Sequence, residues 1–190
     1  IKAKPNYLYN YTNLAYQSFF VSPHAVKMLE TIKFSYLRLG DIRKNISSVE
    51  PILRDSNMLS LDISSISSAY AKANNYCSPN GLNGNEICKL LFYAGVSDKL
   101  KSFGIFEYNQ NLDQDDQTAK LISQIIWYFL EGFQSRVSEE IPSSKNLIFY
   151  NVTGENDTNN MVFCKSKLSN RWWIVLKLSL IHISEPTRQD

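Results

Sequence analysis

Three polar residues near the ends of apolar segments could take part in chemistry: Asp62, Ser64 and Glu107. Asp62 and Glu107 each stand near the end of a short apolar run with the length of a buried strand. In parallel α/β sheets, sites lie beyond the carboxyl ends of strands, so both carboxylates are candidate site residues. Each has a simpler alternative, since Asp62 can cap the following loop and Glu107 can be a solvated or ion-paired strand end.

Neighbouring polar groups have structural explanations. We expect Ser64 to be a neutral loop hydroxyl, because no histidine lies in its segment to activate it as a nucleophile. The acidic cluster Asp113, Asp115 and Asp116 precedes a helical pattern and lacks the EF-hand spacing. We interpret this cluster as helix capping, which suits the helix macrodipole, and not as a calcium site.

The segments that must position these residues alternate between strand-like and helix-like patterns. Apolar runs predict strands over residues 34–39, 58–63, 102–108, 147–151 and 161–164. Helices are predicted after Ser22-Pro23, over residues 48–53, after the capping pair Asn83 and Glu86, and after the acidic cluster. A long loop over 64–84 joins the second strand to the third helix, and loops of this length commonly carry function.

This alternation predicts an α/β fold of three layers, α/β/α, with a mainly parallel sheet. We expect Gly95 and Gly132 to end the last two helices. The final helix should bury a stripe of apolar residues, namely Ile122, Ile125, Ile126, Phe129 and Phe133.

Composition excludes several classes of function. The 190 residues are 44% hydrophobic, which is enough for one globular core. A net charge of +2, with no basic stripe, argues against a nucleic-acid partner. No membrane-length apolar run or secretory signal is visible, so we expect no membrane partner and a cytoplasmic location. Cys77, Cys88 and Cys164 do not form a disulfide pattern and are interpreted as reduced thiols.

Two motifs resemble the C-terminal signature of the arginase, agmatinase and formimidoylglutamase superfamily. Ser60-Leu61-Asp62-Ile63-Ser64, followed by Asn80-Gly81-Leu82 and Glu86, is similar to a strand ending in Ser-x-Asp-x-Asp and its Gly-Gly-Leu-Thr turn. Gly104-Ile105-Phe106-Glu107-Tyr108-Asn109 resembles the strand ending in Glu-x-Asn-Pro, with Gln110 in place of proline. The aromatic segment from Tyr7 to Phe20 and the segment Arg171-Trp172-Trp173 resemble the corresponding segments of formimidoylglutamases.

The resemblance implies a hydrolase that cleaves a C–N bond of a small linear amidine or guanidino substrate with two Mn²⁺ ions. Hard divalent cations favour carboxylate and imidazole ligands, and a metal pair activates the attacking water. By match of position, Asp62 would be a bridging metal ligand and Glu107 would meet the cationic end of the substrate. The full-length protein could be a homo-oligomer, and the chain would be the C-terminal half of one domain, inactive alone.

The chain departs from the family pattern at a ligand. Ser64 stands where the second aspartate of the Asp-x-Asp pair is expected, and a hydroxyl lacks the charge of a carboxylate. No histidine–aspartate ligand motif precedes Asp62. Two hypotheses follow: a manganese-dependent hydrolase in full-length form, or a metal-depleted relative with a binding or regulatory role.

The C-terminal segment is expected to lie outside the domain. Residues 178–188, LSLIHISEPTR, resemble the translation of a sequencing-library adapter, although their alternation also suits an edge strand. We therefore predict a domain over residues 1–177 and a non-native tail over 178–190. His182 is then not a candidate ligand.

Overall fold

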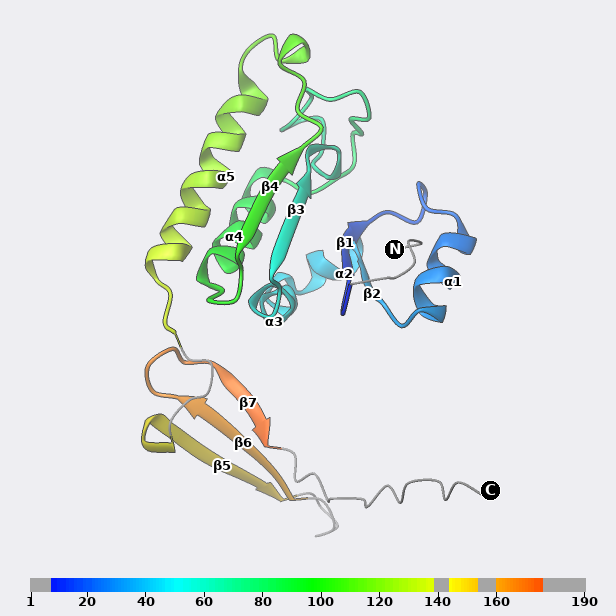
Figure 1. Cartoon of the computed structure of the whole chain (residues 1–190). Coiled ribbons are helices and arrows are strands. Elements are labelled where there is room, and N and C mark those ends of the chain that lie inside the picture. The colour runs from blue at the N-terminus through cyan, green and yellow to red at the C-terminus, as the bar shows by residue number, and fades with distance from the viewer. Residues whose placement is uncertain (1–7, 139–143, 154–159, 176–190) are drawn as a thin grey trace, which may run out of the picture. The chain divides into compact units, whose positions relative to one another are not determined.

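A computed structural model describes residues 8–138, 144–153 and 160–175 (Figure 1). The chain divides into two compact units, Ile1–Arg136 and Val137–Asp190. Compact units need not fold as separate domains, so the single domain over 1–177 stays a prediction. None of the helices in the described part of the chain has both the length and the apolar composition to span a membrane. The tail over 178–190 lies outside the described residues.

The first unit opens with a parallel strand pair connected by a helix. Strand β1 (Thr12–Tyr16) pairs with β2 (Ser35–Arg38), and α1 (Pro23–Thr31) lies between them in the chain. The predicted helix start is confirmed, because the Ser22 side chain accepts a hydrogen bond from the Ala25 N–H.

The strand predicted over 34–39 is too long at its C-terminal end. Leu39, predicted as the last residue of the strand, begins helix α2 (Leu39–Lys44) instead. The buried side chains of Leu39 and Ile42 are three residues apart, so the helix places both in the core.

A second parallel pair forms the centre of this unit. Strands β3 (Met58–Asp62) and β4 (Ser102–Phe106) pair without a register shift. Strand β3 follows the short helices η1 (Ile46–Val49) and α3 (Glu50–Arg54), and Pro51 is tolerated because it lies in the first turn of α3. Parallel strands joined through helices confirm the predicted α/β class.

Helix α4 (Gly84–Val96) begins at the predicted capping box. The side chain of Asn83 accepts from the Glu86 N–H at 2.8 Å, and the Glu86 carboxylate accepts from the Asn83 N–H at 2.8 Å. The predicted apolar face is confirmed, since Ile87, Leu90, Leu91 and Ala94 are all buried.

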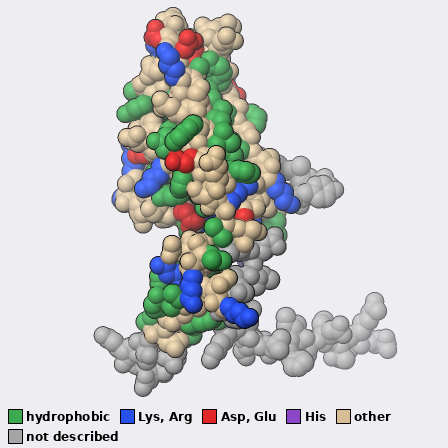
Figure 2. Space-filling model, turned by 90° about the vertical axis from the view of Figure 1, so that its left-hand side faces the viewer, with side chains coloured by type: hydrophobic (Ala, Val, Ile, Leu, Met, Phe, Trp, Pro, Cys, Tyr) green, Lys and Arg blue, Asp and Glu red, His purple; other side chains and the backbone are tan. Residues whose placement is uncertain are grey.

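Helix α5 (Gln117–Gln134) packs along α4 (Figure 1). The predicted apolar stripe is partly wrong. Ile125 is fully buried, and Phe129 contacts Phe103 of β4 with ring centroids 5.1 Å apart, but Ile126 and Phe133 are exposed. Figure 2 views the first unit from the α5 side and shows hydrophobic side chains among charged ones on this surface.

The two glycines expected to end helices lie in the last turns of α4 and α5 and also have a packing role. Gly95 is one residue before the end of α4, and Gly132 is two residues before the end of α5, where the two backbones come close. A Cβ atom at Gly95 would lie 2.2 Å from the Phe129 carbonyl oxygen, and one at Gly132 would lie 2.3 Å from the Phe92 carbonyl oxygen. The glycines are therefore needed for close packing between the last turns of the two helices.

The acidic cluster caps α5, as predicted, through one of its members. The Asp113 carboxylate accepts from the N–H groups of Thr118 and Ala119, at 3.1 and 2.8 Å. Burial alone would raise the pKa of Asp113, but these two backbone bonds, together with bonds from the side chains of Tyr108 and Thr118, lower it below its ordinary value.

The second unit is a three-stranded antiparallel sheet, β5 (Leu147–Thr153), β6 (Asn160–Ser166) and β7 (Trp172–Val175), preceded by the short helix η4 (Ser144–Asn146). The two strands predicted here are confirmed, and β7 is an additional strand. All three pair antiparallel, so parallel pairing among the described residues is confined to the first unit.

Replacing Gly95 with Ala should destabilise the first unit. The added methyl group would overlap a backbone oxygen, so the helices must move apart, at a cost of about 1–3 kcal/mol. Chemical denaturation of the whole chain measures this change. Gly40→Ala is the matched control, because a Cβ there meets no atom within 4 Å. Equal stability of the Gly95 variant and the wild type would contradict the close crossing.

Asp113 should make stability depend on acidity. Because its folded pKa is lowered, its contribution is present above the unfolded pKa of about 3.9 and is lost as pH falls through the folded value. Asp113→Asn should lower stability at pH 7 by about 1 kcal/mol and flatten the acid limb of a melting-temperature profile. Asp115→Asn, at an exposed ion pair with Lys72, should leave that limb nearly unchanged.

Candidate functional site

The two predicted carboxylates stand at the same edge of the β3–β4 pair. Asp62 is the last residue of β3 and is the register partner of Phe106, the last residue of β4. Glu107 follows Phe106 directly, and both carboxylate residues are exposed. The parallel pairing therefore brings together, at one sheet edge, two residues that are 45 positions apart in the chain.

The turn after β3 holds the Asp62 carboxylate. Its Oδ1 accepts a hydrogen bond from the Ser64 backbone N–H at 2.8 Å, and the Ser65 hydroxyl donates to the Asp62 carbonyl at 2.7 Å. Asp62 thereby caps the one-turn helix η2 (Ile63–Ser65). The local capping that the sequence allowed for Asp62 is present, and Ser64 contributes its backbone N–H to it.

Glu107 has an unusual backbone conformation. Its φ is 67°, in the left-handed region that costs a non-glycine residue about 1–2 kcal/mol. Two residues later, the Asn109 side chain caps helix η3 (Gln110–Leu112). The backbone N–H of Asn109 donates to the Ala73 carbonyl at 2.9 Å. The Glu-x-Asn segment is thus bonded to the long loop that follows Asp62.

The long loop is fixed by its backbone. Leu82 bonds back to Ser65 and Ser67, and a Cβ at Gly81 would come within 2.4 Å of the Ser67 nitrogen. Arg43 of α2 donates to the Gly81 carbonyl at 2.6 Å and pairs with Glu86 at 3.1 Å. Only glycine fits this approach, which gives the Asn-Gly-Leu motif a structural role.

Side chains at the N-terminus of α5 hold the middle of the loop. Gln117 donates to the Ala69 carbonyl at 2.6 Å, and the Thr118 hydroxyl accepts from the Ala73 N–H at 3.2 Å. The hydroxyl of Tyr108 donates to Asp113 at 3.2 Å. Partial burial, followed by this bond to a carboxylate, raises the pKa of Tyr108 above its ordinary value.

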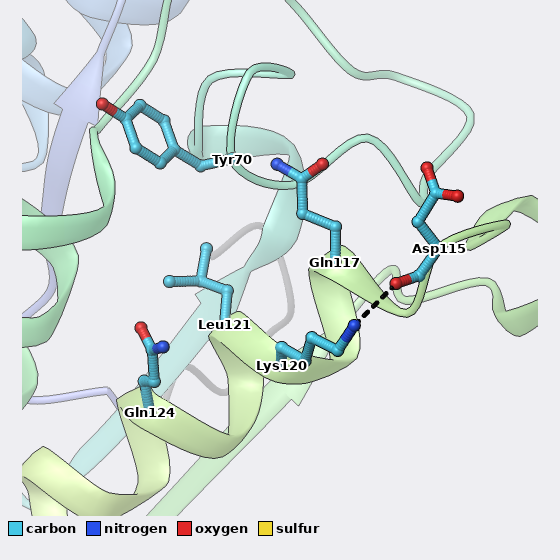
Figure 3. Close-up of a pocket in the computed structure, with 6 residues that line it drawn as sticks. All are labelled: Tyr70, Asp115, Gln117, Lys120, Leu121 and Gln124. Carbon is cyan, nitrogen blue, oxygen red and sulfur yellow. Dashed lines mark hydrogen bonds between the residues drawn. The ribbon is translucent and has the colours of Figure 1, made fainter.

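A pocket of about 400 Å³ lies beside this contact (Figure 3). Tyr70 and residues of the first turns of α5 line it, and neither Asp62 nor Glu107 does. Figure 3 shows the Lys120 amine directed at the main-chain oxygen of Asp115, 3.0 Å away. The Asp115 carboxylate pairs with Lys72, also at 3.0 Å, so the charged groups here are already engaged.

The described residues do not fit a two-metal centre. Among them, no group of three or more His, Cys, Asp or Glu side chains could hold a metal ion. Ser64 offers a hydroxyl where the family resemblance predicts a second carboxylate, and His24 lies exposed in α1. Asp62 alone cannot hold a hard divalent ion, which takes several oxygen ligands.

The sequence analysis missed polar residues at the other parallel pair. Gln17 directly follows β1, and Arg38 is the last residue of β2. The rule that selected Asp62 and Glu107 also applies to them, because both stand at the carboxyl ends of parallel strands. The predicted strand over residues 34–39 already placed Arg38 near a strand end, which is the signal that could have selected it. Only the structure shows that Gln17 and Arg38 line one pocket.

Solved structures of known proteins share the fold of this chain. The solved structures of formiminoglutamase from Trypanosoma cruzi with Mn²⁺ and formimidoylglutamase from Bacillus subtilis each match with a TM-score of 0.62 and 18% identity. They cover 66% and 67% of this chain, which spans only 44% and 42% of theirs. Arginase from Bacillus caldovelox matches with a TM-score of 0.56 and 15% identity, covering 62% of this chain and 42% of its own.

These structural matches establish the arginase-like α/β fold. A search of curated protein sequences found no match. The sequence profile of the Arginase family matches residues 13–131, which include both strand-end motifs and more than half of the chain. The resemblance that rested on Asp62 and Glu107 is confirmed, and the chain belongs to the arginase family.

Proposed function

We propose that this chain is part of a ureohydrolase-type hydrolase that cleaves a C–N bond of a small linear amidine or guanidino compound. The observation that carries the proposal is the placement of Asp62 and Glu107 at one carboxyl edge of a parallel strand pair. The family match supports the reaction class, and the formimidoylglutamase structures with the same fold favour a formimidoylglutamase-like substrate.

The two carboxylates have different roles in this proposal. Asp62, whose carboxylate lies on a turn fixed by two hydrogen bonds, is a ligand contributed to the metal site. Glu107 meets the cationic end of the substrate, since a carboxylate pairs well with a planar amidinium or guanidinium group. Its positive φ supports this role, because strained backbone concentrates at functional positions.

Manganese is the metal that we propose for the complete enzyme, as it is named in the Trypanosoma cruzi structures. The described residues do not form the site alone, so further ligands must come from outside them. We further propose cytoplasmic location and homo-oligomers, with no nucleic-acid or membrane partner.

A second function is favoured by one observation. At position 64 the chain has a hydroxyl instead of a carboxylate, and the backbone N–H of that residue bonds to Asp62. This arrangement stabilises the turn without metal. A relative that keeps the fold as a binding or regulatory protein would require nothing more of these residues.

Metal analysis and hydrolysis assays on the protein that carries this chain separate the two functions. For the hydrolase, we expect bound Mn²⁺ and product release from N-formimidoyl-L-glutamate or arginine. Asp62→Asn should reduce kcat/KM by about 100-fold or more, because a metal ligand is lost. Asp55→Asn, at an exposed ion pair with Lys99, is the matched control and should leave the rate unchanged.

Ser64→Asp tests the alternative directly. If the unmodified protein neither binds Mn²⁺ nor turns over substrate, and the Ser64 variant gains Mn²⁺, the hydrolase proposal is wrong and the metal-depleted function holds. Hydrolysis by the unmodified protein with stoichiometric Mn²⁺ would exclude the metal-depleted function.

A further inference from the structure

A second pocket, of about 280 Å³, lies at the carboxyl ends of β1 and β2. Tyr16 and Arg38, the last residues of the two strands, are register partners and both line it. Asn80 lines it from the long loop that follows Asp62. The backbone carbonyl of Asn80 accepts a hydrogen bond from the Gln17 side-chain amide at 2.8 Å. The pocket is therefore on the side of a parallel sheet where ligands bind.

The backbone of β1 is distorted next to this pocket. The pairing with β2 shifts between Leu14 and Tyr16, so Ala15 is an extra residue in β1. Ala15 is buried and has a φ of 63°, a conformation that alanine rarely adopts. The bulge sets Tyr16 opposite Arg38, and such bulges often aim side chains at sites.

The pocket has an uncompensated positive charge. Arg38 and Arg43 line it, and no Asp or Glu is among its described lining residues. Arg43 is engaged, since its guanidinium bonds to Glu86, to the Gly81 carbonyl and to the Asn80 side chain. The Arg38 side chain is exposed and forms no hydrogen bond or ion pair with the described residues.

Part of the remaining wall is apolar. Tyr16, Phe19 and Leu39 line it beside the polar residues Gln17 and Ser18, and Leu39 is buried in the core below. The Phe19 side chain is 90% exposed and contacts Phe20 edge to face, with ring centroids 5.2 Å apart. A guanidinium beside exposed aromatic surface suits a planar anion attached to an apolar body, because the fork of N–H donors matches two carboxylate oxygens.

From this geometry we propose that the pocket at Arg38 binds a small organic carboxylate. Arg38 pairs with the carboxylate group, Tyr16 and Phe19 contact the apolar part, and Arg43 holds the Asn80 side of the pocket in place. This binding requires neither metal nor hydrolysis, so it holds or fails independently of the function proposed above.

The test is a titration of the whole chain with sodium benzoate, followed by amide and side-chain NMR shifts. We expect binding with a Kd on the order of 1 mM, with shifts centred on Arg38, and at least about 10-fold weaker binding of benzamide, which has the same shape without the charge. Equal binding of the two compounds would overturn the proposal. Tighter binding of inorganic phosphate than of benzoate would also overturn it, since that result identifies a phosphate site.

Two variants locate the binding without depending on unfolding. Arg38→Gln should weaken benzoate binding about 10-fold or more, and Lys44→Gln, which removes an exposed charge from the same helix region, should not. Gly40 lines the pocket and has open space around its Cβ position, so Gly40→Met should obstruct the pocket while the melting temperature stays equal or rises. Unchanged benzoate binding by either pocket variant would refute the assignment.

Discussion

The parallel, in-register pairing of β3 with β4 is the constraint on which the site depends. It places Asp62 and Glu107 at one edge, although 39 residues separate the two strands in the chain. The connection contains the long loop and α4, and a crossover of this kind is what parallel neighbours require. Buried residues on the strands and helices, such as Leu61 and Leu91, share one core, so the edge rests on a packed base.

The long loop is held in place from two sides. Arg43 of α2 bonds to its C-terminal end, and Gln117 and Thr118 of α5 bond to its middle. These are mostly hydrogen bonds to backbone groups, which would be costly to leave unpaired if buried. The loop is therefore part of the framework, and it connects the Asp62 turn to both the Glu107 segment and the pocket at Arg38.

The turn at Asp62 gives this carboxylate a structural role of its own. In this chain the carboxylate accepts the Ser64 N–H and caps a helical turn. A carboxylate that caps a turn stabilises the fold whether or not a metal is bound. The hydrogen bonds at Asp62 are therefore compatible with both proposed functions, which differ in what they require at position 64.

The sequence alone determined the local features and the family. The capping box at Asn83 and the start of α1 depend on neighbouring residues, so pattern was sufficient to predict them. The strand-end motifs depend on residue type and order, which identified Asp62 and Glu107 as candidate site residues.

Only the tertiary structure decided features set by contacts between distant segments. Gly95 and Gly132 were expected at helix ends and lie in the last turns of α4 and α5, but their close backbone contact depends on how the two helices pack. Ile126 and Phe133 have the right period for burial, but their exposure depends on what packs against α5. Arg38 became a site candidate only when pairing and a bulge set it opposite Tyr16, because a pocket is a property of segments brought together.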